Sequence, residues 1–223
     1  MPRVWITRSA SMAQASAARL KAKGYDAFSA PLIHISYETP APDAPCDEAY
    51  LIFTSRNGVA AFAQAQTARH WPCLCVGDAT AKAARDAGFK TVTSARGAAD
   101  DIVAWAGKNI DRDQPLYHAS GNHPRGEIIE RLQQGGFKRA RRALFYRTLC
   151  VTHDPRLEPK QDDIILLYSP MAAQGLAALG LDISGMVIIS MSRAVDAALG
   201  VQMCKARYIA DLPTEDSLFA HLP

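Results

Sequence analysis

The chain has 223 residues, of which 48% are hydrophobic and 21% charged, and this composition excludes collagen-like, coiled-coil and wholly disordered proteins. Its formal net charge of +3 is too small to attract polyanions in general, so any anion site must be local. No apolar run approaches the roughly 20 residues that span a bilayer, and the N-terminus lacks a secretory signal pattern. We therefore expect a cytoplasmic protein that does not bind membranes.

Short β-branched or aromatic runs alternate with Ala-rich helical segments along the chain, which is the α/β pattern. Strands are predicted at residues 4–7, 51–54, 73–76, 91–93, 116–119, 164–168, 187–189 and 206–209, and longer extended segments at 26–38 and 138–151. Helices are predicted at 9–23, 57–66, 79–87, 98–108, 125–134 and 172–179, and a last one carries Val195, Ala198 and Leu199. Each unit reads as strand, polar turn and helix, so we expect parallel sheets covered by helices.

Motifs at the strand ends return at an offset that stays between 112 and 114 residues. The matched motifs are Gly24-Tyr25 with Gly136-Phe137, Phe53-Thr54-Ser55 with Leu167-Tyr168-Ser169, Val76-Gly77 with Ile189-Ser190, and Gly88-Phe89 with Gly200-Val201. A constant period indicates architecture more firmly than single motifs do. We therefore predict that residues 1–112 and 113–223 are two copies of a five-strand unit, and that the long segments 26–38 and 138–151 cross between two lobes.

Several kinds of site have no support in the sequence. The five cysteines and six histidines form no paired motif, so we expect neither a disulfide framework nor a metal site. The Walker, G-x-G-x-x-G and G-x-S-x-G patterns are missing, which argues against a bound nucleotide and against a serine nucleophile on a strained turn.

The densest basic run is Lys138-Arg139-Ala140-Arg141-Arg142. An edge strand protected from aggregation by its charges explains this run better than a ligand site does. Nucleic-acid binding is not expected, because the net charge is low and no aromatic platform interleaves with the run.

The turns after the predicted strands are rich in small hydroxyl and amide residues. In open α/β sheets, ligands bind beyond the carboxyl ends of the strands, where helix N-termini present free N–H groups. The candidate residues in these turns are Thr7, Arg8, Ser55, Asn57, Gly77, Thr80, Ser120, Gly121, Ser169 and Ser192. Helix capping requires the same residue types at the same places, so capping better explains each turn taken alone. Only their convergence from two lobes on one cleft would favour a site for carboxylates or phosphates.

Several motifs, in order and almost from end to end, resemble the uroporphyrinogen-III synthase family. They are Val4-Trp5-Ile6-Thr7-Arg8 with Ala30-Pro31-Leu32-Ile33, Leu51-Ile52-Phe53-Thr54-Ser55-Arg56-Asn57-Gly58-Val59, Val76-Gly77-Asp78-Ala79-Thr80, Arg125-Gly126-Glu127, Phe145-Tyr146-Arg147-Thr148 and Tyr168-Ser169-Pro170. Each motif is weak by itself, and the order and spacing carry the resemblance.

The resemblance implies two similar α/β domains, each a three-layer domain with a parallel sheet, joined by a two-stranded β ladder. Residues 1–35 and 152–223 would form one domain, residues 40–145 the other, and residues 36–39 and 146–151 the linker strands. The implied function is that of a cofactor-free lyase of heme and tetrapyrrole biosynthesis. It closes hydroxymethylbilane to uroporphyrinogen III with loss of water, inverting ring D through a spirocyclic intermediate. We expect a monomer that makes transient contact with the preceding enzyme of the pathway.

The resemblance also assigns site residues. Tyr146 stands where the family has its best candidate for assisting loss of the substrate hydroxyl, since a protonated phenol can donate a hydrogen bond to a departing oxygen. The strand pattern alone describes Tyr146 as a half-buried strand tyrosine. The residues expected to hold the substrate carboxylates are Thr7, Arg8, Ser55, Asn57, Gly77, Thr80, Ser120, Gly121, Arg125, Ser169 and Ser192.

Three positions depart from the family pattern. Ser190-Met191-Ser192-Arg193 replaces a turn that contains glycine in the family, although Ser192 can still donate a hydrogen bond. Ser9 replaces a proline, and a threonine is replaced near Ser94-Ala95.

Two other functions stay open at this point. One is a non-catalytic, two-lobe cytoplasmic protein that closes on a small anionic ligand, as the duplication and the cap-rich turns suggest. The other is a nucleic-acid-binding module that uses the basic strand, for which binding would weaken steeply with salt.

Overall fold

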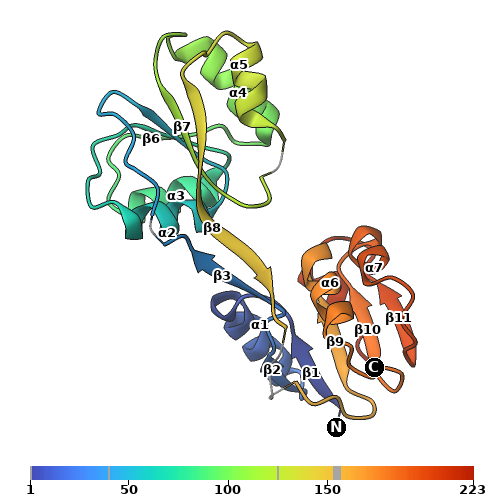
Figure 1. Ribbon diagram of the computed structural model, residues 1–223. Coiled ribbons are helices and arrows are strands. Elements are labelled where there is room, and N and C mark those ends of the chain that lie inside the picture. The colour runs from blue at the N-terminus through green and yellow to red at the C-terminus, as the bar shows by residue number, and fades with distance from the viewer. Residues whose placement is uncertain (1, 40, 125, 153–156) are drawn as a thin grey trace. The chain divides into compact units, whose positions relative to one another are not determined.

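The computed structural model describes residues 2–39, 41–124, 126–152 and 157–223. The chain divides into two compact units: unit 1 comprises Met1–His34 and Leu149–Pro223, and unit 2 comprises Ile35–Thr148. Unit 1 is drawn in blue and in orange to red, and unit 2 in light blue to yellow (Figure 1). The predicted division at residues 35, 40, 145 and 152 lies close to this one. Whether each unit is an autonomous domain stays a prediction.

Unit 1 contains a five-stranded parallel sheet with strand order β11-β10-β9-β1-β2. Its strands are β1 (Arg3–Ile6), β2 (Asp26–Ser29), β9 (Ile164–Leu167), β10 (Val187–Ser190) and β11 (Ala206–Ile209). Its helices are α1 (Ala10–Ala22), α6 (Pro170–Ala178), α7 (Arg193–Leu199) and α8 (Glu215–Phe219). The central strands are almost entirely apolar because both faces of the sheet are covered; only Arg3 at the start of β1 and Ser190 at the end of β10 are polar.

Unit 2 contains a six-stranded sheet with strand order β3-β8-β7-β4-β5-β6, in which β4 to β8 are parallel. Its strands are β3 (Ile33–Tyr37), β4 (Tyr50–Phe53), β5 (Cys73–Cys75), β6 (Val92–Ser94), β7 (Leu116–Gly121) and β8 (Ala140–Cys150). Its helices are α2 (Arg56–Ala65), α3 (Asp78–Asp86), α4 (Ala99–Asn109) and α5 (Ile128–Gln134). The predicted α/β class with parallel sheets is confirmed.

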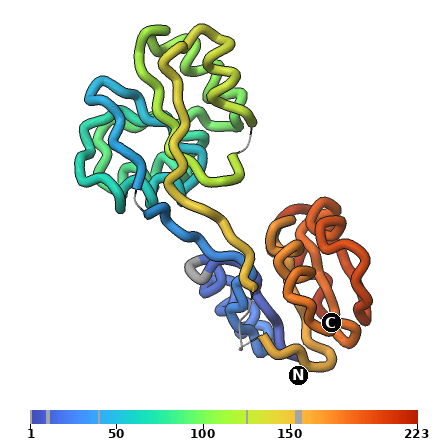
Figure 2. Tube along the Cα trace, in the orientation of Figure 1, coloured from blue at the N-terminus to red at the C-terminus, as the bar shows by residue number. Residues whose placement is uncertain are grey.

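Two strands carry the chain from one unit to the other, β3 on the way out and β8 on the way back (Figure 2). The Glu38 N–H donates to the Phe145 carbonyl at 3.0 Å, and the Val151 N–H donates to the Leu32 carbonyl at 3.0 Å. Since the numbers rise on one strand as they fall on the other, the pair is antiparallel. Residues 32–38 and 145–151, the later parts of the two long predicted segments, therefore pair where the chain crosses between the units.

The two parallel sheets have the same strand order. The sequence β2-β1-β9-β10-β11 in unit 1 corresponds to β8-β7-β4-β5-β6 in unit 2, and equivalent strands lie about one offset of the predicted repeat apart. In each sheet, successive strands of the chain are added in opposite directions on the two sides of one pair of neighbouring strands. This pair is β1 and β9 in unit 1 and β4 and β7 in unit 2. We call the carboxyl ends of these two strands the switch point of the unit. This shared topology supports the duplication, which stays an inference.

Each sheet is covered on both faces. In unit 2, the buried residues of α2 and α3 pack on one face, and those of α4 and α5 on the other. In unit 1, α6 and α7 cover one face, and α1 and α8 cover the other. Each unit is therefore a three-layer α/β structure, and its switch point lies at the edge of the sheet where the strands end.

Four details of the sequence prediction were wrong. The segment 26–38 is two strands, β2 and β3, because the chain breaks at residues 30–32, which include Pro31. The helix predicted at 125–134 begins only at Ile128, because Gly126 and Glu127 adopt left-handed conformations with φ of 82° and 44°. Ser120 and Gly121 end strand β7 instead of forming a turn. Helix α8 was not predicted at all.

Candidate active site

Three predicted site residues meet at the switch point of unit 2. The Tyr146 hydroxyl lies 2.9 Å from Ser55 Oγ, and the Tyr146 ring packs directly against Gly121. A Cβ atom on Gly121 would approach two carbons of this ring to 2.6 Å and the hydroxyl oxygen to 3.0 Å. Only glycine at position 121 leaves room for the phenol in this position.

A β-bulge directs Tyr146 toward this point. The register between β7 and β8 pairs Ser120 with Leu144 but Gly121 with Tyr146, so one extra residue of β8 is accommodated there. As a result, the consecutive residues Phe145 and Tyr146 are both buried in the same core cluster, against the usual alternation of a strand. Tyr146, which is 9% exposed, therefore faces the turn between β4 and α2.

Helix α2 holds Ser55 in place. Ser55 is the N-cap residue of α2, and its Oγ accepts a hydrogen bond from the Gly58 N–H at 3.0 Å. A Cβ on Gly58 would lie 2.8 Å from the Ala119 carbonyl oxygen of β7, so this glycine lets the first turn of α2 approach the strand closely. Ser55 therefore contacts both the start of a helix and the phenol of Tyr146.

A buried histidine supports the same turn from the other face of the sheet. Nε2 of His118, on β7, lies 3.1 Å from Thr54 Oγ1, and Thr54 directly precedes Ser55. Burial, together with the positive charge of Arg142, lowers the pKa of His118 to about 4, so the imidazole is neutral at physiological pH. Neither His118 nor Thr54 was among the predicted site residues.

The other predicted residues of unit 2 are not part of this cluster. Asn57 is exposed in the first turn of α2, and Gly77 is the N-cap residue of α3 with open space beside its Cα. Thr80 is 6% exposed in α3, and Ser120 is 2% exposed and donates to the Gly121 carbonyl at 3.2 Å. Arg125 lies outside the described residues.

In unit 1, three predicted residues have structural hydrogen bonds. Thr7 is 1% exposed, and its hydroxyl donates to the Leu166 carbonyl at 2.6 Å. Ser169 and Ser192 are the N-cap residues of α6 and α7, where they accept from the N–H groups of Ala172 at 3.2 Å and Val195 at 3.4 Å. The capping interpretation is therefore confirmed for both serines, whose side-chain O–H groups keep a proton to donate.

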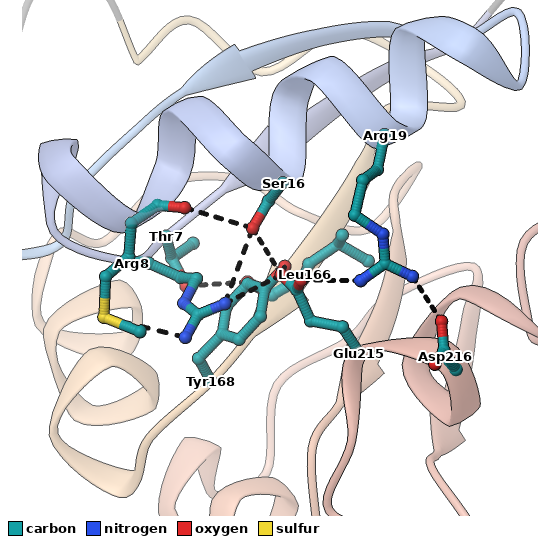
Figure 3. Close-up of polar contacts among 9 residues, drawn as sticks. Thr7, Arg8, Ser16, Arg19, Leu166, Tyr168, Glu215 and Asp216 are labelled. Atoms are coloured by element: carbon teal, nitrogen blue, oxygen red, sulfur yellow. Dashed lines mark hydrogen bonds and ion pairs between the residues drawn. The ribbon is translucent and has the colours of Figure 1, made fainter. Parts of the chain in front are cut away.

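Arg8, the remaining predicted residue, lies in an ion cluster at the switch point of unit 1 (Figure 3). Its guanidinium donates to Oε1 of Glu215 at 2.8 Å and stacks on the Tyr168 ring at 4.7 Å from the centroid. Tyr168 donates to the same carboxylate oxygen at 3.1 Å, and Arg19 donates to the other one at 2.9 Å. The ion pair with Glu215 already satisfies much of the charge that was expected to hold a substrate carboxylate.

The charges in this cluster shift two pKa values. Burial raises the pKa of Glu215, but hydrogen bonds from Ser16, Tyr168 and Arg8 outweigh this effect, so the net pKa is lowered and the side chain is ionised. Burial and the Glu215 charge raise the pKa of Tyr168, so its phenol keeps its proton and acts as a donor. The sequence signal that was missed is Thr214 followed by Glu215 and Asp216, a typical helix start.

No helix in the described part of the chain is long and apolar enough to span a membrane.

No curated protein sequence matches the chain. Among solved structures, the uroporphyrinogen-III synthetase of Helicobacter pylori 26695 matches with a TM-score of 0.67 at 17% identity, over 98% of this chain and 96% of that one. A mutant uroporphyrinogen III synthase of the extremely thermophilic bacterium Thermus thermophilus matches with a TM-score of 0.52 at 16% identity, over 99% of this chain and 97% of that one. These similarities establish a common fold.

The family model described as Uroporphyrinogen-III synthase HemD matches residues 14–220, which is nearly the whole chain. The matched range contains both β3 and β8, the parallel sheet of unit 2 and most of that of unit 1. The chain therefore belongs to the uroporphyrinogen-III synthase family, the cyclising lyases of tetrapyrrole biosynthesis that act on hydroxymethylbilane.

Proposed function

We propose that this chain closes hydroxymethylbilane to uroporphyrinogen III without a cofactor, and that Tyr146 donates a hydrogen bond to the departing hydroxyl of the substrate. The observation that carries this assignment is the 2.9 Å contact between Tyr146 and Ser55, formed by a bulge in β8 and a glycine at position 121. A tyrosine with only a packing role would require neither a glycine under its ring nor a hydrogen-bonding partner at a helix start.

The hydrogen bonds around Tyr146 fit the role of a donor. The Gly58 N–H donates to Ser55 Oγ, which leaves the Ser55 O–H free to donate to the Tyr146 oxygen. The phenol O–H can then point to the substrate, in a chain where each bond strengthens the next. The positive end of the α2 dipole favours electron density on the phenol oxygen as the proton moves toward the leaving group.

The proposed reaction balances without an external reagent. The carbon–oxygen bond of the hydroxymethyl group breaks, and the hydroxyl leaves as water after it takes up a proton. The substituted carbon of ring D attacks the resulting methylene and forms the spirocyclic intermediate. This intermediate opens and closes again at the other α-carbon, with ring D inverted, and that closure releases one proton. Positioning the two ends of the flexible substrate supplies most of the rate, as in other reactions that are limited by proximity.

The substrate carboxylates require several anion-binding points. In our proposal, these are the helix starts at Ser55 and Asn57, Gly77 and Thr80, Ser169, and Ser192, together with Thr7, Ser120, Gly121 and the arginines Arg8 and Arg125. Backbone N–H groups at a helix start bind anions without adding net charge, which suits a chain with a net charge of only +3.

We also propose that the protein is a cytoplasmic monomer that contacts the preceding enzyme transiently. Mass measurement in solution tests the oligomeric state, and cell fractionation tests the location.

Isomer analysis tests the function directly. Purified protein is mixed with freshly prepared hydroxymethylbilane, and the oxidised products are separated into type I and type III porphyrins. We expect the type III isomer, since closure without ring inversion gives type I. Type I product alone would contradict the proposal and favour the non-catalytic binding protein, for which a thermal-shift series with sugar phosphates and linear tetrapyrroles would identify the ligand.

A further inference from the structure

The switch point of unit 1 holds a carboxylate that comes from the chain itself. Arg8 follows β1, Tyr168 follows β9, and these two strands flank the point where the strand order reverses. Ligands of open α/β sheets bind at this point. In this structure, the position is occupied by the side chain of Glu215, the first residue of the C-terminal helix α8 (Figure 3).

The groups around Glu215 form a complete carboxylate site. Oε1 accepts from Arg8 at 2.8 Å, from Tyr168 at 3.1 Å and from the Ser16 hydroxyl, and Oε2 accepts from Arg19 at 2.9 Å. The site thus contains two guanidinium groups and two hydroxyl donors. Ser16 is 0% exposed, so only a group that takes the place of the Glu215 carboxylate can reach its hydroxyl.

The site is reachable from solvent on its outer side. The side chains of Arg8 and Arg19 are 21% and 43% exposed, and that of Glu215 is 16% exposed. A ligand can therefore approach the two guanidinium groups first and the buried hydroxyl last.

Helix α8 does not depend on Glu215 for its attachment. Its residues Leu218 and Phe219 are 0% and 5% exposed in the core cluster shared with α1, and the Thr214 hydroxyl caps the helix by accepting from the Ser217 N–H at 3.3 Å. The Glu215 side chain can therefore rotate outward about its own bonds while α8 stays docked. Arg19 keeps its second partner, Asp216, when this happens.

We propose that Arg8, Ser16, Arg19 and Tyr168 form a binding site for a propionate side chain of the ligand, and that Glu215 occupies this site until the ligand displaces it. Beyond its Cα, a glutamate consists of two methylene groups and a carboxylate, so it has the size and charge of a propionate substituent. Exchange replaces one carboxylate by another and leaves neither guanidinium without a counter-charge. The identity of the ligand as a propionate-bearing tetrapyrrole rests on the proposed function.

The test compares ligand binding with and without the internal carboxylate. The probe is uroporphyrin I, a stable tetrapyrrole with propionate side chains, and its dissociation constant is measured by equilibrium fluorescence titration. An internal occupant weakens apparent affinity in proportion to the fraction of time that it fills the site. We expect Glu215→Gln to bind the probe roughly threefold more tightly than the unaltered protein, and Glu215→Ala more tightly still. If the alanine variant fails to fold, the glutamine variant, which preserves the size of the side chain, decides.

Asp216→Asn is the matched control. It removes the same charge from the next residue of α8, whose side chain is 86% exposed and points at Arg19 from outside the site. If the tighter binding came only from a more positive protein, Asp216→Asn would produce it as well, and the proposal would fail. It would fail equally if both Glu215 variants bound the probe no more tightly while their melting temperatures fell, because Glu215 would then be only a tie between α1 and α8.

A second variant identifies the site itself. Adding Arg8→Gln to Glu215→Gln should abolish the gain in affinity, and persistence of the gain would place the probe elsewhere. These binding measurements do not require turnover, so they are independent of the isomer analysis. A protein that formed no type III isomer but gained affinity through Glu215 would disprove the synthase function and still support the site.

Discussion

The two switch points have the same topology and opposite chemistry. In unit 2, a neutral hydrogen-bonded chain runs from Gly58 through Ser55 to Tyr146, and the buried His118 beside it is uncharged at physiological pH. In unit 1, the equivalent place holds two arginines around a carboxylate. A neutral phenol is suited to assist a departing hydroxyl, and a charged cluster is suited to bind an acidic side chain.

The difference between the two units shows that one sheet topology can support two different kinds of site. The strand order brings polar groups to the same edge in both units, but it does not decide which groups arrive there. In unit 2, a bulge and a glycine determine the position of the functional side chain. In unit 1, it is determined by a helix whose contact with Arg8 spans 207 residues of sequence. Substitutions at the two switch points should therefore change different quantities, turnover in unit 2 and ligand affinity in unit 1.

Removing the phenol hydroxyl should have the largest effect. We expect Tyr146→Phe to lower kcat about a thousandfold, the middle of the range for a general acid, with little change in melting temperature. Tyr117→Phe is the matched control, because it removes a hydroxyl from a neighbouring tyrosine of the same core cluster, one that donates to the Asp43 carbonyl. Equal kcat values for the two variants would remove Tyr146 from the mechanism. The corresponding change in unit 1, Tyr168→Phe, should raise KM instead.

The buried histidine should make unit 2 sensitive to mild acid. The pKa of His118 is lowered to about 4 in the folded protein from 6.5, so between these values the unfolded chain binds more protons than the folded one. The free energy of unfolding therefore falls as the pH is lowered from 6.5 toward 4. The total loss is about 3 kcal/mol. Glu215 acts at lower pH, because its pKa is lowered from 4.5 and its contribution disappears only as the pH falls below that value.

Urea unfolding between pH 7 and pH 4 measures this dependence. His118→Gln keeps a group that can hydrogen-bond to Thr54 and should give a much shallower fall in unfolding free energy. His34→Gln, at an exposed histidine, should follow the unaltered protein. If His118→Gln and the unaltered protein lose stability in parallel over this range, the imidazole is not the group that titrates.

A methyl group on Gly121 should disturb the phenol without removing it. The added carbon would lie 2.6 Å from two carbons of the Tyr146 ring, so the ring must shift and its contact with Ser55 is disturbed. Because a misplacement of about 1 Å can cost 10²-fold in rate, we expect Gly121→Ala to lower kcat about a hundredfold. Gly107→Ala, in the last turn of α4, meets no atom closer than 3.6 Å and should keep full turnover while raising stability by up to about 1 kcal/mol. Full activity in Gly121→Ala would show that the ring position is not critical.

The sequence predicted the framework far better than the contacts at the switch points. Strands such as β4 and β9 were recognisable because an apolar run between polar turns indicates a buried parallel strand. The bulge was not recognisable, because the local pattern of β8 gives no sign that Phe145 and Tyr146 share one face. Helix α8 was missed because its five residues are too few to show a helical period. The partner of Arg8 could not be predicted from a local pattern either, because Glu215 lies 207 residues away in the sequence.

Truncating Ser55 should have the smallest effect and separates its two roles. Ser55→Ala removes a helix cap, which costs about 1 kcal/mol of stability, and the partner of the Tyr146 hydroxyl, for which we expect a loss of about tenfold in kcat. Ser169→Ala removes the equivalent cap in unit 1 and should lower stability by a similar amount, but any kinetic loss should fall on KM because, among the described residues, no phenol hydroxyl is hydrogen-bonded to Ser169. In a Tyr146→Phe background, Ser55→Ala should lower kcat no further, since a residue that acts through the phenol has no effect once the hydroxyl is gone. Additive losses in this double-mutant cycle would mean that the Ser55 hydroxyl assists the reaction independently of the phenol, and the two side chains at the switch point of unit 2 would then act as separate donors.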